Sequence, residues 1–240
     1  MTTRFSVEEF ARRLEVALGG RLVSVLLYGS AARLGGGRDG PRGANILIIC
    51  DPVDPSVLAA LEAPIAAWTH GGHPAPIVLS LHEWRTSSDV FAIEYDDLRA
   101  AHQLIAGRDP WAGITVRRED VQRQLELELM GKLVQLRQAY VAAAGDRGRL
   151  TLLVDRSASG FFTMLRTLLR FMGKPVPGDT ESLLRTAAAL AGFAPDALAP
   201  VAAHVEGRAP LKLRERDPLA AAYLDAVART AAFVNDHSSH

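Results

Sequence analysis

The dipeptide Gly29-Ser30 is the clearest candidate for a phosphate-binding turn in this sequence. It follows an apolar segment, residues 22–28, and a Gly/Arg-rich stretch separates it from a second apolar segment, residues 46–50. Both segments are short and rich in leucine or β-branched residues, as buried strands are. A glycine and a serine hydroxyl at the end of a strand allow the next backbone N–H groups to face an anion. We therefore expect Gly29 and Ser30 to bind a phosphate group.

The order of strand, Gly-Ser, short helix, loop and second strand resembles the signature of the nucleotidyltransferase superfamily. That superfamily includes the aminoglycoside nucleotidyltransferases and the minimal nucleotidyltransferases of prokaryotes. In it the second strand opens with Asp-x-Asp and a third acid stands on a later strand. The Asp pair binds two magnesium ions, which bridge the triphosphate and activate the attacking hydroxyl. The resemblance implies an α+β fold, with a nucleotidyltransferase-like small mixed sheet and flanking helices, followed by an all-α helical bundle domain.

The sequence departs from this signature at the metal ligands. The positions that match Asp-x-Asp read Gly43-Ala44-Asn45, so neither position carries a carboxylate. Magnesium takes oxygen ligands, usually one or two carboxylates together with phosphate oxygens and water. Glycine supplies no side chain, and asparagine supplies only a neutral amide oxygen. We therefore predict a degenerate site, without metal ligands, that at most binds a nucleotide or phosphate at the Gly-Ser turn.

Acids recruited from elsewhere would restore the chemistry, which leaves two further hypotheses open. The candidates for catalytic residues are Asn45 itself, Asp51 after the second strand, and Asp89 and Glu94 on a later connector. If these acids converge on Ser30, the chain is a Mg²⁺-dependent enzyme that transfers a nucleoside monophosphate from a nucleoside triphosphate to a small-molecule hydroxyl. The third hypothesis is an interaction or scaffold protein whose helical bundle forms a homodimer.

Two basic residues are candidates for nucleotide contacts. Arg33 stands just before the glycine-rich loop, residues 35–43, and an arginine beside a phosphate site would bind its oxygens. Lys132 belongs to a later helical segment that resembles the helix lining the substrate cleft in aminoglycoside-type nucleotidyltransferases. The alternatives are a solvated loop for Arg33 and an ordinary polar helix face for Lys132.

The composition excludes several other classes of protein. Of 240 residues, 48% are hydrophobic and 22% charged, as in globular proteins with a real core. Lys+Arg and Asp+Glu both total 27, so bulk charge does not predict nucleic-acid binding. The single cysteine, Cys50, rules out a disulfide framework and a multi-cysteine metal site. No apolar run reaches the roughly eighteen residues of a membrane span, and no secretory signal opens the chain, so we expect a cytoplasmic protein. Abundant arginine and scarce lysine indicate a bacterial source.

The periodicity of the apolar residues changes near residue 115. Before it, helix and strand patterns alternate. After it, apolar residues recur at three- and four-residue steps without strand signals, which is typical of a helical bundle. We therefore predict two domains, a nucleotidyltransferase-like domain at residues 1–114 and an α-helical bundle domain at residues 115–240. The predicted later strands are residues 76–81 and 102–106. The predicted helices include residues 55–68, 117–144, 149–172, 180–191, 195–205 and 218–235.

Overall fold

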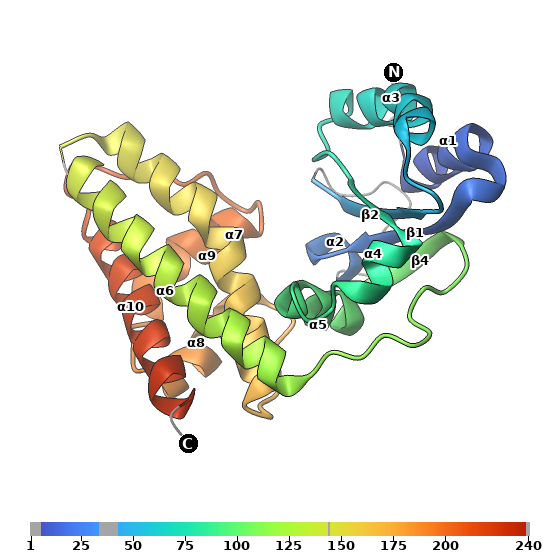
Figure 1. Cartoon of the computed structure of the whole chain (residues 1–240). Coiled ribbons are helices and arrows are strands. Elements are labelled where there is room, and N and C mark those ends of the chain that lie inside the picture. The colour runs from blue at the N-terminus through green and yellow to red at the C-terminus, as the bar shows by residue number, and fades with distance from the viewer. Residues whose placement is uncertain (1–5, 34–42, 144, 239–240) are drawn as a thin grey trace. The chain divides into compact units, whose positions relative to one another are not determined.

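The computed structural model describes residues 6–33, 43–143 and 145–238. The chain divides into two compact units, Met1–Val116 and Arg117–His240. The first unit contains the sheet and the second contains the long helices, in chain order (Figure 1). The division into a nucleotidyltransferase-like domain at residues 1–114 and a helical bundle domain at residues 115–240 stays a prediction.

The first unit is built on a four-stranded mixed sheet with strand order β3-β2-β1-β4. Its strands are β1 (Leu22–Tyr28), β2 (Asn45–Cys50), β3 (Ile77–Ser80) and β4 (His102–Gly107). Strand β1 pairs antiparallel with both β2 and β4, whereas β2 and β3 are parallel. The parallel pair requires a crossover connection, which helix α3 (Pro55–His70) supplies. The mixed sheet predicted from the sequence is confirmed.

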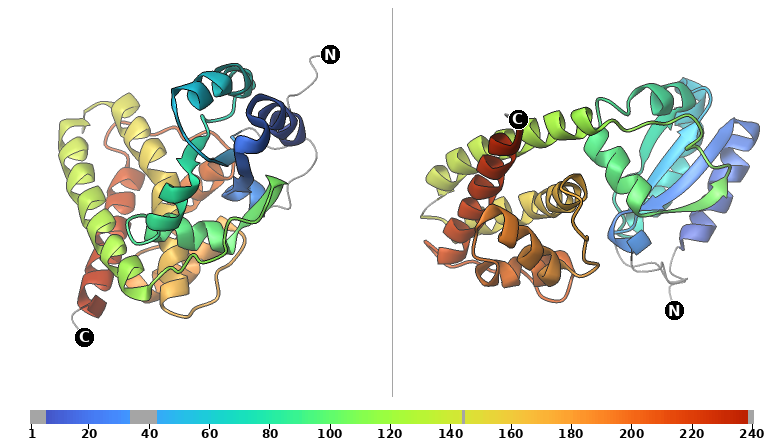
Figure 2. Two further views of the ribbon diagram at one scale, coloured as in Figure 1. Left: turned by 45° about the vertical axis from the view of Figure 1, so that its right-hand side comes forward. Right: turned by 90° about the horizontal axis from the view of Figure 1, so that it is seen from below.

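Helices cover both faces of this sheet. Helices α1 (Val7–Leu18) and α3 lie on one face, and α4 (Leu81–Thr86) and α5 (Ala92–Ala100) on the other, as Figures 1 and 2 show. Along β2, Ile46 and Ile48 are buried with α1 and α3, while Leu47 and Ile49 are buried with α4 and α5. A strand that is covered on both sides has no polar face, which is why its sequence is a continuous apolar run.

Local capping explains where the short helices of this unit begin. The Ser6 hydroxyl accepts a 3.1 Å hydrogen bond from the Glu9 backbone N–H at the start of α1. Ser80 and Glu83 form a reciprocal capping box at α4. The connector that carries Glu94 is helical from Ala92, where α5 begins.

The second unit consists of helices in its described part. They are α6 (Arg118–Ala143), α7 (Arg147–Phe171), α8 (Thr180–Ala191), the 3₁₀ turn η2 (Asp196–Leu198), α9 (Ala199–Val205) and α10 (Pro218–Ser238). The leucine stripe of α6 is buried where α6 packs with α7 and α10, which run beside it in Figures 1 and 2. None of the described helices is long and apolar enough to cross a membrane.

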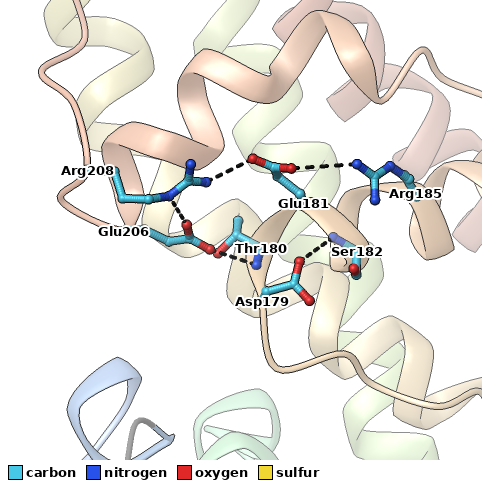
Figure 3. A network of polar contacts seen from close by, with 7 residues as sticks. All are labelled: Asp179, Thr180, Glu181, Ser182, Arg185, Glu206 and Arg208. Atoms are coloured by element: carbon cyan, nitrogen blue, oxygen red, sulfur yellow. Dashed lines mark hydrogen bonds and ion pairs between the residues drawn. The ribbon is translucent and has the colours of Figure 1, made fainter.

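A polar network ties the end of α9 to the beginning of α8 (Figure 3). The Glu206 carboxylate accepts a 2.8 Å hydrogen bond from the Thr180 backbone N–H and a 2.5 Å bond from Arg208. Arg208 also donates to Glu181 over 3.0 Å. Glu206 therefore satisfies one of the backbone donors that the first turn of a helix leaves without an intrahelical acceptor. The charged groups of Glu206, Arg208 and Glu181 therefore have a structural role at this junction.

Candidate functional site

Strand register brings three strand ends together at one edge of the sheet. Because β1 is antiparallel to both of its neighbours, its last residue lies beside the first residues of β2 and β4. Tyr28 is paired with Asn45 on one side and with His102 on the other. Gly29 and Ser30 follow Tyr28 directly, so the Gly-Ser turn lies at this edge. Neither Tyr28 nor His102 was singled out from the sequence. Their place at this edge follows from the antiparallel pairing of β1 with β2 and β4.

Gly29 has a backbone and a neighbour that only glycine fits. Its φ of +76° lies in the left-handed region that side-chain-bearing residues rarely adopt. A Cβ at this position would lie 3.1 Å from the Asn45 side-chain nitrogen Nδ2. Immediately afterwards Ser30 begins the short helix α2 (Ser30–Arg33), in which the Arg33 N–H donates to the Gly29 carbonyl over 3.1 Å. The structure thus brings Gly29 and Asn45, two of the predicted site residues, into direct proximity.

The two positions that match Asp-x-Asp differ in backbone conformation. Asn45 is the first residue of β2, but Gly43 stands in the turn before it with a φ of +89°. Residues with a side chain rarely adopt that conformation, so the two positions are not equivalent in backbone. Among the described residues, no group of three or more His, Cys, Asp or Glu side chains could hold a metal ion. Asp39, in the preceding loop, lies outside the described residues.

Asp51 lies at the opposite end of β2 from Asn45. Its backbone N–H donates to the Arg21 carbonyl, beside the start of β1, over 2.9 Å. Six residues of extended strand span about 20 Å, which separates the Asp51 carboxylate from Gly29 by far more than a metal–ligand distance. Asp89 is exposed in the turn after α4. The structure does not bring Asp51 together with Gly29 and Asn45.

Glu94 acts electrostatically at the Gly29 edge. The pKa of the half-buried Tyr28 hydroxyl is raised, first by burial and then by the negative charge of Glu94. The Glu94 side chain projects from the first turn of α5 and belongs to an exposed residue. Of the acids proposed as replacements, Glu94 is therefore the one whose charge reaches the last residue of β1.

Arg33 is held by an acid that the sequence analysis did not single out. Its guanidinium Nη1 donates to both carboxylate oxygens of Asp97, each over 3.1 Å, and the two side chains are only 19% and 10% exposed. Asp97 lies on α5, 64 residues after Arg33, and no local pattern in the sequence indicates this pairing. The positive charge of Arg33 is thus already neutralised, and a phosphate would have to compete with Asp97 for it.

His102 connects the site edge to the segment that follows β4. Its ring nitrogen Nε2 accepts a 3.1 Å hydrogen bond from the Trp111 indole, and Nδ1 lies 2.8 Å from the Leu98 carbonyl oxygen. These two contacts correspond to a neutral imidazole with its proton on Nδ1. The Arg99 guanidinium lies 5.0 Å from the Trp111 ring centre, at cation–π distance. His102 is therefore fixed in orientation as part of the structural support for the edge.

Lys132 lies on α6 in the helical unit, where its ammonium group packs across α7. A Cβ built on Gly160 of α7 would lie 3.4 Å from the Lys132 Nζ atom. Burial lowers the pKa of Lys132, and the negative charge of Glu128 partly opposes this effect. Gly29 and Lys132 belong to different units, so the contact of Lys132 with a nucleotide bound at Gly29 stays a prediction.

The sheet topology, the Gly-Ser turn at the end of β1 and the helices that follow define a nucleotidyltransferase-like fold. A solved structure with a similar fold is that of spectinomycin adenyltransferase AAD(9) from Enterococcus faecialis, determined with ATP and spectinomycin. The similarity has a TM-score of 0.54 at 12% sequence identity and covers 91% of this chain and 95% of that one. No protein-family model and no curated protein sequence matches the chain. At this identity the likeness concerns the fold alone.

Proposed function

We propose that this protein is a nucleotidyltransferase-fold protein that binds a nucleotide at the Gly29-Ser30 turn and does not catalyse nucleotidyl transfer. The observation that carries this proposal is Asn45. Its amide stands beside Gly29, at the position where a catalytic member of the superfamily has a metal-binding carboxylate. Phosphoryl and nucleotidyl transfer depend almost entirely on positioning and on electrostatic stabilisation by metal ions. A site without the metal ligands loses the second contribution.

Two features support binding in the absence of that chemistry. Gly29 keeps a backbone without a side chain at the strand end, so its neighbouring N–H groups stay open to an anion. The AAD(9) structure of similar fold was determined with ATP. Arg33 is one turn further along and would add a charge-assisted hydrogen bond if phosphate displaces Asp97.

Titration calorimetry with ATP, with and without magnesium, tests the proposal. The wild-type protein is expected to bind ATP with an affinity that is indifferent to magnesium. Gly29→Val should abolish binding, because it fills the turn and strains a left-handed backbone, and Ser30→Ala should weaken it. Circular dichroism spectra of both variants establish that they are folded. Absence of ATP binding under both conditions would overturn the proposal, and strictly magnesium-dependent binding would favour the active transferase.

Asn45→Asp tests the role of the missing carboxylate directly. The substitution changes one amide to a carboxylate of nearly the same shape and should make ATP affinity rise when magnesium is added. Asn235→Asp is the matched control, since it makes the same change on the exposed face of α10. If Asn45→Asp responds to magnesium no more than Asn235→Asp does, position 45 does not face the phosphates.

A homodimeric interaction protein is a second candidate function, favoured by exposed apolar side chains on α6. Leu127 and Val141 are 72% and 78% exposed. Met130 and Val134, which lie between these two residues in the sequence, are each nearly half exposed. Their three-, four- and seven-residue steps place them on one helix face. Sedimentation velocity of the wild type beside Leu127→Glu distinguishes the candidates, because a dimer through this face should dissociate in the variant. A monomeric wild type would remove this candidate.

A further inference from the structure

A groove of about 610 Å³ runs between α6 and α7 near the turn that joins them. Its described lining is unusual in charge for a chain whose net charge is zero. Three lining residues are cationic, namely Lys132 on α6 and Arg149 and Arg156 on α7, and none of the lining residues is anionic. Three positive charges in one concave surface raise the local concentration of anions.

The cations of this groove are largely uncompensated in the described part of the chain. Neither Lys132 nor Arg156 has a hydrogen bond or ion pair there, and Glu128 acts on Lys132 only through its charge. The Arg149 guanidinium lies 3.4 Å from one carboxylate oxygen of Asp146. The other oxygen of Asp146 accepts hydrogen bonds from the backbone N–H groups of Gly148 and Arg149 at the start of α7. The nearby Asp155 is bound to His204 over 2.6 Å. The acids around the groove are therefore engaged elsewhere or only weakly paired with it.

The rest of the lining is apolar. Leu136 and Ala139 of α6 face Leu152 and Leu153 of α7, and the short alanine side chains leave the space between the helices open. The lining hydroxyl of Ser157 donates to the Tyr223 hydroxyl over 2.7 Å and is thereby held in place. A concave apolar surface with a few fixed polar groups is the usual form of a small-molecule site.

We propose that this groove binds a small organic anion, one that carries a phosphate group on an aromatic or aliphatic body. The anionic group would lie between Lys132 and Arg156, and the apolar body would lie against Leu136 and Leu152. The inference assigns Lys132 to a ligand of the helical unit in place of a nucleotide held at Gly29. It does not rest on the proposed function, because every lining residue belongs to the second unit.

Titration with 2-naphthyl phosphate tests this proposal, with 2-naphthol and inorganic phosphate as probes of each half of the ligand. Binding of one 2-naphthyl phosphate per chain is expected, at least about tenfold tighter than either half alone. The double variant Lys132→Gln, Arg156→Gln should lose about tenfold or more in affinity, because it removes both cations that hold the phosphate. Lys174→Gln, an exposed lysine outside the groove, is the matched control. Equal affinity in the double variant and the control would overturn the proposal.

Chemical labelling of the wild-type protein provides a test that no folding defect can disturb. The chain has three lysines, Lys132, Lys174 and Lys212, of which the last two are exposed. Pyridoxal 5′-phosphate condenses with a lysine amine, releasing water, and borohydride then reduces the imine to a stable amine. The groove and the lowered pKa of Lys132 predict that it is labelled first, and that 2-naphthyl phosphate protects it. Preferential labelling of Lys174 and Lys212, or no protection at Lys132, would contradict the groove as an anion site.

Discussion

The sheet edge and the helical groove derive their shape from different parts of the chain. At the edge, backbone decides the geometry, through a strand register and glycines at positive φ such as Gly29. In the groove, side chains on two regular helices decide it, and the backbone is ordinary. Substitutions that add a side chain should therefore have opposite effects on the stability of the two units. A change that adds one atom should damage the first, whereas the second should tolerate it and respond mainly to changes of charge.

The strongest test of this contrast is glycine to alanine in each unit. At Gly107, where β4 ends, φ is +80° and a Cβ would lie 2.2 Å from the Val23 carbonyl oxygen. Relief of that overlap requires strand movement, so Gly107→Ala should lower the free energy of unfolding by about 3 kcal/mol or more. All three tryptophans belong to the first unit, and therefore urea unfolding followed by tryptophan fluorescence reports this change.

Gly131→Ala is the counterpart in the helical unit and should have the opposite sign. Gly131 lies within α6, and a Cβ there would have no neighbour within 4 Å. Alanine in an exposed helix interior is more stable than glycine by about 0.5–1 kcal/mol. Unfolding followed by far-ultraviolet circular dichroism, which is dominated by the helices, measures this gain. Destabilisation by Gly131→Ala would show that the α6 backbone is constrained after all.

The second test removes a carboxylate from an ion pair in each unit. Asp97→Asn leaves the Arg33 guanidinium, 19% exposed, without its negative partner and should cost about 2 kcal/mol. Asp225→Asn breaks the exposed i, i+4 pair with Arg229 on α10 and should cost less than about 0.5 kcal/mol. The two unfolding free energies are compared in the same buffer. Similar losses in both variants would mean that burial does not distinguish the pairs.

The smallest expected effect concerns pH. Burial alone raises the pKa of Glu206, but the hydrogen bonds from Thr180 and Arg208 outweigh it, so the pKa is lowered from its ordinary value of 4.5. The charged form therefore stabilises the fold above pH 4.5, and this contribution is lost as the pH falls through the folded-state pKa. Glu206→Gln should be less stable than the wild type by under about 1 kcal/mol at pH 6.

The decisive measurement is the pH dependence of that stability difference. It should shrink as the pH falls below 4.5, because the wild-type carboxylate then takes up its proton. A difference that is constant over this range would assign the loss to packing of the Glu206 side chain, and the network in Figure 3 would then owe nothing to its charge.

The sequence predicts the fold well because the fold follows from apolar periodicity. The apolar run at residues 22–28 can be buried as a strand, and the apolar residues at three- and four-residue steps in α6 can be buried on one face of a helix. Both elements lie where the sequence predicts them. The start of α7 likewise has a local cause, since the Asp146 side chain accepts hydrogen bonds from the backbone N–H groups of Gly148 and Arg149. Local patterns of this kind do not depend on distant parts of the chain.

The candidate site could be predicted only in part, because its remaining contacts join distant segments. Gly29 and Asn45 were recognised from a motif, but the pairing of Arg33 with Asp97 links residues 64 positions apart. The approach of His102 to Tyr28 depends on the order of strands in the sheet, which periodicity does not determine.

The central position of β1 also has a consequence for the order of folding. Its pairing with β4 joins Tyr28 to His102, more than seventy residues later, whereas α6 and α7 are neighbours connected by a short turn. Contacts between distant segments form slowly, because the intervening chain must lose entropy before they are made. On a ribosome, the Gly29 edge cannot be completed until nearly all of the first unit has been synthesised. The candidate nucleotide site is therefore a late product of folding, made by the last strand to join the sheet.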